Sequence, residues 1–177
     1  MDRKPPESLR LFYALWPDQA TRAALGVLQA ELQGRKTLHG NLHVTLAFLG
    51  LQPAERLPSL RQILATLPSM EMTLVIDRIG YFPRHRIAWA GLNEIPENLS
   101  LLQRSLSEAL VQNEFTFDRQ PRFKPHITLA RDAAVPPQRP FEAIHWRVDH
   151  LALVQSSTEA EGVGYRVLAS RRLNAAG

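Results

Sequence analysis

Residues 41–50, Asn-Leu-His-Val-Thr-Leu-Ala-Phe-Leu-Gly, decide how this chain is interpreted, because their His-x-Thr-Leu pattern occurs again at residues 126–129 as His-Ile-Thr-Leu. The chain holds six His and eight Thr among 177 residues, so chance would place a Thr two positions after a His about 0.3 times. The two copies begin at His43 and His126, 83 residues apart and close to half the chain length. The repeat therefore indicates two similar halves, each with one copy.

Each copy lies in an apolar run that alternates as a β-strand does. Residues two apart in a strand point to the same face, so His43 shares a face with Thr45, and His126 with Thr128. Each pair sets an imidazole beside a hydroxyl, about 6.5–7 Å along its strand. If the two strands lie side by side, two histidines and two threonines line one cleft.

Such a cleft suits chemistry at phosphorus. Imidazole is the side chain best able to give or take a proton near neutral pH. Two imidazoles on opposite sides of one phosphorus can act as base on water and as acid on the leaving oxygen. The hydroxyls of Thr45 and Thr128 can donate to the non-bridging oxygens, where charge builds in the transition state. This scheme requires no metal ion and no cofactor.

Three further residues are candidates for substrate binding. Arg131 comes five residues after His126 and could clamp a phosphate oxygen. Phe48, five after His43, and Phe12, on the predicted first strand, could each stack against a base, with core packing as the alternative interpretation.

Other aromatic and basic residues have a plainer interpretation. Trp89 and Trp146 are interpreted as core residues. Several basic residues could contact RNA, but charged residues of this kind are usually only solvated. They are Arg84, Arg86, Arg119, Arg122 and Lys124.

Composition limits the class of protein. A length of 177 residues with 45% hydrophobic content predicts one domain, or one domain made of two similar lobes. The net charge of +4 is compatible with an anionic substrate but too small to indicate nucleic-acid binding by itself. The absence of cysteine excludes disulfides and thiolate metal sites. No apolar run approaches 18 residues, and residues 1–7 are charged, so we expect no membrane span and a cytoplasmic location.

Hydrophobic periodicity predicts strands and helices in alternation. Helices are expected from Asp18 as N-cap to a stop at Gly34, from Pro53 to Leu67, and from Pro96 to Asn113. Strands are expected at residues 9–15, 42–49, 72–79, 87–92, 123–130, 141–146, 148–154 and 165–173. Gly50 is expected to end the strand that carries the first motif. The pattern predicts an α+β or α/β chain with antiparallel sheets.

The motifs resemble those of the two-histidine (2H) phosphoesterases, and within them the bacterial RNA 2′,3′-cyclic phosphodiesterase family, also named 2′-5′ RNA ligase. The similarity lies in the two HxTx motifs and in three flanking stretches, and it extends over nearly the whole chain. The stretches are residues 10–15 (Arg-Leu-Phe-Tyr-Ala-Leu), 89–91 (Trp-Ala-Gly) and 125–131 (Pro-His-Ile-Thr-Leu-Ala-Arg).

The resemblance implies a bilobal α+β fold over residues 1–177. Two pseudo-twofold related lobes would line a central cleft with antiparallel sheets, helices would lie outside, and the strands at 42–49 and 123–130 would each carry one motif. It also implies hydrolysis of RNA 2′,3′-cyclic phosphate ends to 2′-phosphate ends without metal. His43 would be the general acid toward O3′, and His126 the general base on water. The reverse reaction would join a cyclic end to a 5′-hydroxyl through a 2′-5′ bond.

Alternatives from other classes stay open at this point. The same chemistry could serve small cyclic nucleotides or ADP-ribose cyclic phosphates rather than RNA ends. A cleft without useful catalysis would make an RNA-end binding module. A two-histidine metal site lacks a third ligand at a recognisable spacing, so we expect no metal. We expect a monomer, because two lobes already complete the site.

Overall fold

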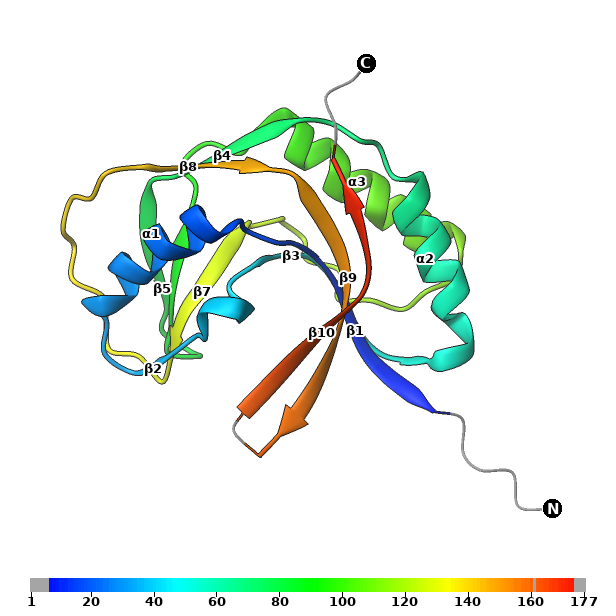
Figure 1. Ribbon diagram of the computed structural model, residues 1–177, viewed down its shortest axis with the longest axis horizontal. Coiled ribbons are helices and arrows are strands. Elements are labelled where there is room, and N and C mark those ends of the chain that lie inside the picture. Colours follow the sequence, from blue (N-terminus) through cyan, green and yellow to red (C-terminus); the bar gives the residue numbers. More distant parts are fainter. Residues whose placement is uncertain (1–6, 161, 174–177) are drawn as a thin grey trace.

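The computed structural model describes residues 7–160 and 162–173, and these residues form strands and helices in the alternation that the sequence predicts (Figure 1). The strands are β1 (Ser8–Leu15), β2 (Arg35–Lys36), β3 (Val44–Pro53), β4 (Met72–Ile76), β5 (Arg78–Phe82), β6 (Ile87–Gly91), β7 (His126–Arg131), β8 (Ile144–Val148), β9 (His150–Glu159) and β10 (Gly162–Arg172). The helices are α1 (Gln19–Ala30), α2 (Leu57–Thr66) and α3 (Glu97–Gln112), with 3-10 turns at His39–Asn41 and Ala54–Arg56. Residues 1–6, from which the sequence argued against a signal peptide, lie outside the described ranges.

The strands form one long antiparallel path and one separate pair. The path runs β10-β9-β1-β3-β7-β6-β5, with β2 also on β7, and β4 pairs with β8 apart from it. The two motif strands, β3 and β7, meet where Val44 pairs with Ile127. The path therefore consists of two antiparallel sheets joined at the motifs, and the predicted α+β fold with antiparallel sheets is confirmed.

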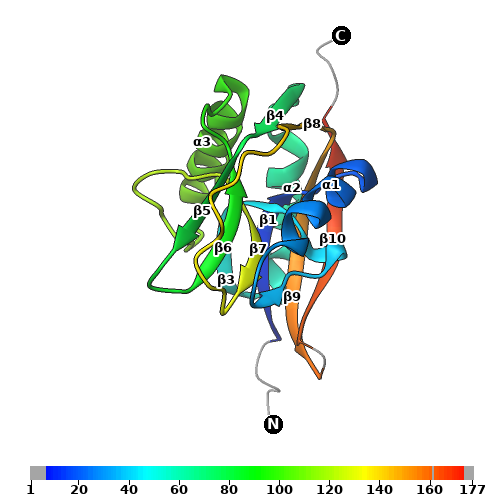
Figure 2. The same ribbon diagram turned by 90° about the vertical axis from the view of Figure 1, so that its left-hand side faces the viewer.

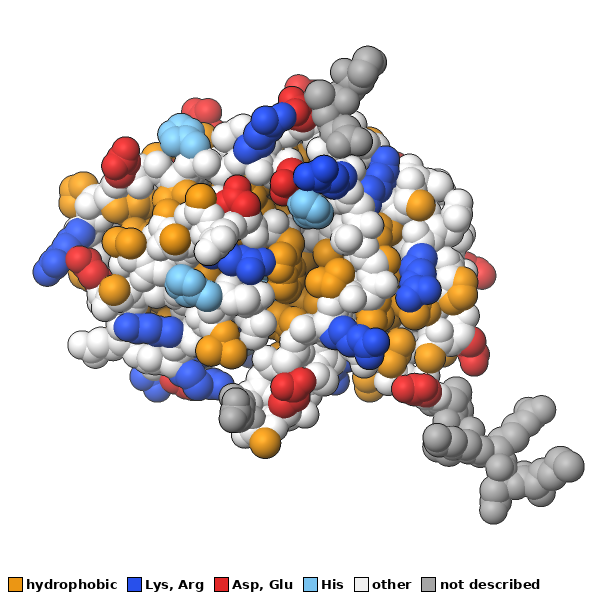
Figure 3. All heavy atoms as spheres, viewed as in Figure 1, with side chains coloured by type: hydrophobic (Ala, Val, Ile, Leu, Met, Phe, Trp, Pro, Cys, Tyr) orange, Lys and Arg blue, Asp and Glu red, His pale blue; other side chains and the backbone are white. Residues whose placement is uncertain are grey.

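Each helix buries a leucine-rich stripe against the strands. On α3, the residues at helical spacing are fully buried, namely Leu99, Leu102, Leu106 and Leu110. Helices α2 and α3 pack against β9, β10 and β3, whereas α1 packs against β7 and β8, so helices lie outside both sheets (Figures 1 and 2). Hydrophobic side chains show near the middle of the face drawn in Figure 3. None of the helices in the described ranges is long and apolar enough to cross a bilayer.

Several predicted boundaries are wrong. The helix predicted from Pro53 begins at Leu57, and the strand predicted at residues 148–154 runs to Glu159. Three further differences have a clear physical reason. Helix α1 begins at the predicted cap, because Asp18 Oδ1 accepts from the backbone N–H of Thr21 at 2.7 Å, but it ends at Ala30 instead of Gly34. Gly34 has φ +112° and lies where a Cβ would be 2.7 Å from the carbonyl oxygen of Arg131, so it allows β2 to approach β7. Gly50 lies inside β3, at φ +65°, instead of ending it.

The third of these differences divides the strand predicted at residues 72–79. It breaks at Asp77 because β4 and β5 pair with different partners, β8 and β6. Hydrophobic alternation in the sequence indicates which residues are buried, but it does not show where a strand changes its pairing partner.

Strand β3 also holds a long connection, residues 113–125, in place. The buried amide of Gln52 donates to the carbonyl oxygens of Leu49 at 2.8 Å and Thr116 at 2.9 Å. The backbone N–H of Asp118 donates to the carbonyl oxygen of Phe48 at 2.8 Å. These bonds fix the connection against the strand that carries the first motif.

We predict that Gln52→Leu lowers the free energy of unfolding by about 1–3 kcal/mol, because the buried carbonyl of Leu49 and the partly buried carbonyl of Thr116 lose their donor. For a domain of this size, each kcal/mol corresponds to about 2–4 °C in Tm. Thermal denaturation checks the prediction, with Gln62→Leu on the exposed face of α2 as the matched control. Equal melting of the two variants would contradict the role given to Gln52.

Candidate active site

The structure brings the two motifs together at the join between the sheets. Because β3 and β7 are antiparallel and Val44 pairs with Ile127, His43 lies toward Thr128 and Thr45 lies toward His126. The two imidazoles are thus diagonal to each other, each with its own threonine two residues along the strand. The groups that the sequence singled out for proton transfer and phosphate binding therefore gather where the two strands meet, and Thr45 and His126 line a pocket there.

A one-residue β-bulge follows each threonine. Across β1 and β3, Tyr13 pairs with Ala47 and Ala14 pairs with Thr45, which leaves Leu46 without a partner. A bulge of this kind reverses the later alternation of the strand. Phe48, three residues after Thr45, therefore returns to the face that carries His43.

The same bulge occurs on the second strand, at the equivalent leucine. Across β6 and β7, Ala88 pairs with Ala130 and Trp89 with Thr128, which leaves Leu129 without a partner. Arg131 is thereby turned toward the cleft, and it lines the same groove as Phe48. Each half therefore presents a His, a Thr and one further side chain, which is aromatic in one half and cationic in the other.

Backbone carbonyls orient both imidazoles. Nδ1 of His43 lies 2.6 Å from the carbonyl oxygen of Asn41, and Nδ1 of His126 lies 2.7 Å from that of Lys124. A carbonyl oxygen can only accept, so Nδ1 carries the proton in both rings. Nε2 is then the atom available for proton transfer, and that of His43 is 3.0 Å from the hydroxyl of Thr45.

Aromatic rings enclose His43. Its ring stacks on Trp16 with centroids 5.5 Å apart and lies 5.0 Å from Phe12. Tyr165 of β10 meets it edge-on at 5.3 Å. Phe12 is only 2% exposed, so its contact with the cleft is made through His43.

A second aromatic pair encloses His126. Phe82 and Trp89 meet its ring edge-on, with centroids at 5.2 and 6.1 Å. Trp89 is half-buried beside His126, which corrects its interpretation as a core residue, whereas Trp146 is fully buried as predicted. The indole of Trp89 lies where a Cβ on Gly80 would collide with it, so a glycine is needed opposite.

Sequence reasoning missed three of these aromatic residues: Trp16, Tyr165 and Phe82. Trp16 could have been found, because it continues the alternation of Phe12 and Ala14 along one face of β1. Tyr165 and Phe82 reach the cleft only through the pairing of β10 with β9 and of β5 with β6, which the sequence does not reveal.

Burial keeps both imidazoles neutral. Desolvation lowers the pKa of His43 to about 4, and the charges of His126 and Arg131 lower it further in the same direction. Desolvation likewise lowers the pKa of His126 from its ordinary value, and Arg131 adds to the effect. At pH 7, both Nε2 atoms therefore carry a lone pair.

Arg131 is the charged group nearest to this chemistry. It is exposed at the end of β7, and its charge acts on both imidazoles and on the hydroxyl of Tyr165. No carboxylate in the described part of the chain forms an ion pair with it. Within the same ranges, no group of three or more His, Asp or Glu side chains is placed to hold a metal ion.

Comparisons with known proteins identify relatives of this chain. The sequence profile of the 2'-5' RNA ligase superfamily matches residues 15–160. The RNA 2',3'-cyclic phosphodiesterase of Thermus thermophilus is 34% identical over 176 residues, which cover 90% of this chain and 88% of the relative. The enzyme of the same name from Escherichia coli (strain K12) is 34% identical over 113 residues, and the matched part spans 64% of each chain. The solved structure of E. coli LigT in apo form superposes with a TM-score of 0.85 at 30% identity, covering 94% of this chain and 98% of that one.

We predict that His43 remains neutral, with its proton on Nδ1, down to about pH 4. Burial opposes the charged form, and the Asn41 carbonyl selects the tautomer. NMR titration of the imidazole nitrogens measures both properties, and His43→Asn identifies the signals. Protonation of His43 at or above pH 6.5 in the free protein would refute the electrostatic account of the cleft.

Proposed function

Because the chain belongs to the 2'-5' RNA ligase superfamily of two-histidine phosphoesterases, we propose that it hydrolyses RNA 2′,3′-cyclic phosphate ends to 2′-phosphate ends without a metal ion. The observation that carries the proposal is the meeting of two imidazole–hydroxyl pairs beside Arg131, whose charge acts on both imidazoles. Two proton-transfer groups and one unpaired guanidinium match a phosphodiester anion that needs an acid, a base and charge stabilisation.

In the proposed reaction, Nε2 of His126 takes a proton from water, and the water oxygen forms a bond to phosphorus. The bond from phosphorus to O3′ breaks, and Nε2 of His43 gives its proton to the leaving O3′. The product is a 2′-phosphate with a free 3′-hydroxyl. Thr45 and Thr128 donate to the non-bridging oxygens, and Arg131 neutralises the charge that builds on them.

The lowered pKa of His43 means that the acid must gain its proton as the substrate binds. A phosphodiester anion favours the charged form of a nearby imidazole and opposes the effect of desolvation. Protonation and substrate binding are therefore linked. The rings of Phe12, Trp16 and Tyr165 hold His43 in place while its charge changes.

Substrate contacts follow from the bulges. Phe48 is 39% exposed and offers a ring to the base of the terminal nucleotide, while Phe12 acts through its contact with His43.

We propose as well that residues 1–177 form one bilobal domain with pseudo-twofold related halves. Its support is the matching bulge, tautomer and aromatic enclosure of the two motifs.

The same site run in reverse would join a cyclic end to a 5′-hydroxyl through a 2′-5′ bond. A second candidate substrate class is small nucleotide cyclic phosphates, including those of ADP-ribose. The support for this second class is that E. coli LigT has been solved in complex with nucleotides, namely NADP+, ATP and 3'-AMP. The third alternative, an RNA-end binding module, predicts binding without turnover. A monomeric state and a cytoplasmic location stay predictions.

We predict that His43→Ala and His126→Ala each lower turnover of a short RNA ending in a 2′,3′-cyclic phosphate by about 10²–10⁴-fold, the usual effect of one acid–base group. Product analysis with chelator present checks the loss together with the identity of the product. His145→Ala, which removes an exposed histidine of β8, is the matched control.

Each result has a defined meaning. Near-wild-type turnover by His126→Ala would refute the two-histidine mechanism. A 3′-phosphate product would reverse the leaving group, and a chelator-sensitive reaction would refute metal independence. Tight binding of 2′-phosphate RNA with no turnover would favour the binding module.

We predict a bell-shaped pH profile for kcat/KM with its maximum below pH 6.5. The reaction needs one imidazole protonated and the other neutral, and both pKa values in the free protein lie below the ordinary 6.5. Activity then falls as pH rises above the pKa of the acid. The profile of kcat should lie at higher pH, because bound substrate raises these pKa values. A maximum of kcat/KM at or above pH 7 would contradict the assignment.

A further inference from the structure

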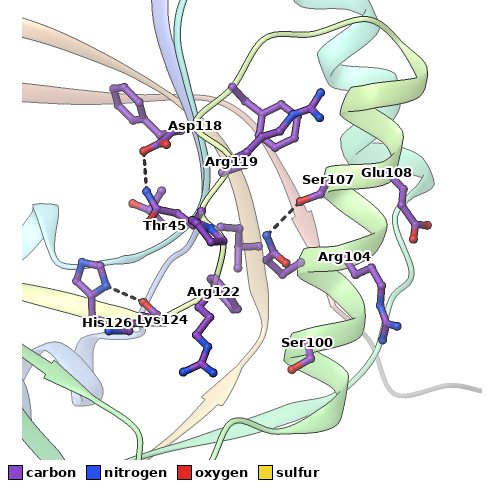
Figure 4. Close-up of a pocket in the computed structure, with 18 of the residues that line it drawn as sticks. Thr45, Ser100, Arg104, Ser107, Glu108, Asp118, Arg119, Arg122, Lys124 and His126 are labelled. Atoms are coloured by element: carbon purple, nitrogen blue, oxygen red, sulfur yellow. Dashed lines mark hydrogen bonds between the residues drawn. The ribbon is translucent and has the colours of Figure 1, made fainter.

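A large groove continues from one end of the catalytic cleft. Its volume is about 1400 Å³, and it runs from Thr45 and His126, past the connection at residues 113–125, to α3 (Figure 4). His43 and Thr128, at the other end of the cleft, do not line it. The groove is therefore continuous with one side of the site only.

Aromatic rings occupy the opposite side of the cleft. Phe12, Trp16 and Tyr165 surround the ring of His43, and Tyr165 also meets Phe12 and Trp16 edge-on. A polymer whose terminal phosphate sits between the two imidazoles consequently leaves the cleft on the side of Thr45 and His126, where the groove begins.

The charge of the groove suits a polyanion. Five cationic side chains line it against two acidic ones, Glu108 and Asp118. The cationic residues are Arg104, Arg119, Arg122, Lys124 and Arg131. No ion pair joins any of these five to a carboxylate in the described part of the chain, so their charges are available to a ligand.

Aromatic rings occur along the same path. Phe48, Phe82, Phe117 and Phe123 line the groove together with the cations. Arg119 lies over the ring of Phe117, with its guanidinium carbon 5.3 Å from the ring centroid. A basic groove with interspersed rings is the general design of single-strand binding sites, where phosphates meet cations and bases stack on rings.

The connection that carries most of these residues is ordered by its contacts. Thirteen residues without helix or strand are uncommon in a compact domain and usually serve a function. Gln52 and the carbonyl of Phe48 hold it to β3, and Phe115 is buried beneath the guanidinium of Arg56 at 3.8 Å. The groove is therefore formed before any ligand enters.

We propose that this groove holds the RNA chain on the 5′ side of the cyclic phosphate end, so that the preferred substrate is an oligonucleotide instead of a mononucleotide. The inference rests on the proposed function, because it places the terminal phosphate between His43 and His126. It adds a site for the nucleotides that precede that phosphate. Arg119 and Arg122 bind their phosphates, and Phe117 and Phe123 stack on their bases.

The test compares a nucleoside 2′,3′-cyclic phosphate with oligonucleotides of about four to eight residues that end in the same group. For the wild-type protein, kcat/KM should rise at least tenfold with length. The double variant R119Q/R122Q should lower the ratio of oligonucleotide to mononucleotide kcat/KM about tenfold. R10Q/R166Q, which removes two exposed arginines outside the groove, is the matched control.

Salt dependence gives a second measurement. Single-stranded nucleic acid contributes a slope of about −0.7 in log K against log salt for each phosphate that a protein neutralises. Anisotropy binding of an oligonucleotide with a 2′-phosphate end should show a slope that is shallower by about 1.4 in R119Q/R122Q than in wild type. Thermal melts of both double variants establish that they fold.

The outcomes separate this inference from the proposed function. Turnover of the mononucleotide with no gain from added length would overturn the groove assignment and leave the function intact. An unchanged length effect and salt slope in R119Q/R122Q would also overturn it. If R119Q/R122Q lowered ligation but not hydrolysis, the groove would instead bind the RNA that supplies the 5′-hydroxyl, and the groove assignment would be overturned. If wild type turns over neither substrate, the proposed function fails, and the salt slope alone still tests the groove.

Discussion

The antiparallel pairing of Val44 with Ile127 is the contact on which the rest of the site depends. It joins two sheets at the centre of each motif and places the imidazole of one half toward the hydroxyl of the other. A shift of one residue would turn both sets of side chains into the core, because side chains alternate along a strand. The register is held by the buried neighbours Val44, Leu46, Ile127 and Leu129. The positions of the motif side chains and the core packing are thus set by the same alternation.

The bulges at Leu46 and Leu129 divide each motif strand into two parts with opposite side-chain alternation. Before the bulge, alternate residues supply the imidazole and the hydroxyl. The bulged leucine and the alanine after it are both buried in the core. Phe48 and Arg131 return to the cleft at equivalent positions with different chemistry. One scaffold, used twice, therefore presents a ring on one side and a charge on the other, and an asymmetric ligand has a preferred orientation.

Much of this could be predicted from sequence. The HxT repeat is periodic and local, so the facing side chains and the antiparallel α+β fold followed from alternation and from the leucine stripe of α3. Events that depend on partners could not be predicted. The break at Asp77 and the arrival of Tyr165 and Phe82 at the histidines arise from strand pairing. Trp89 looks like any apolar strand residue, and only the pairing of its strand with β7 brings its ring to His126.

The imidazoles of both motifs are oriented by peptide carbonyls, at Asn41 and Lys124, where many enzymes use a carboxylate. A carboxylate titrates and can be altered by substitution, whereas a peptide carbonyl keeps its dipole at every pH and under every side chain. The orientation of the two rings is therefore determined by the backbone conformation. Substitution of residue 41 or 124 leaves this orientation intact, because the backbone carbonyl remains. Acid conditions change the charge of the imidazoles without removing the hydrogen bonds that orient them.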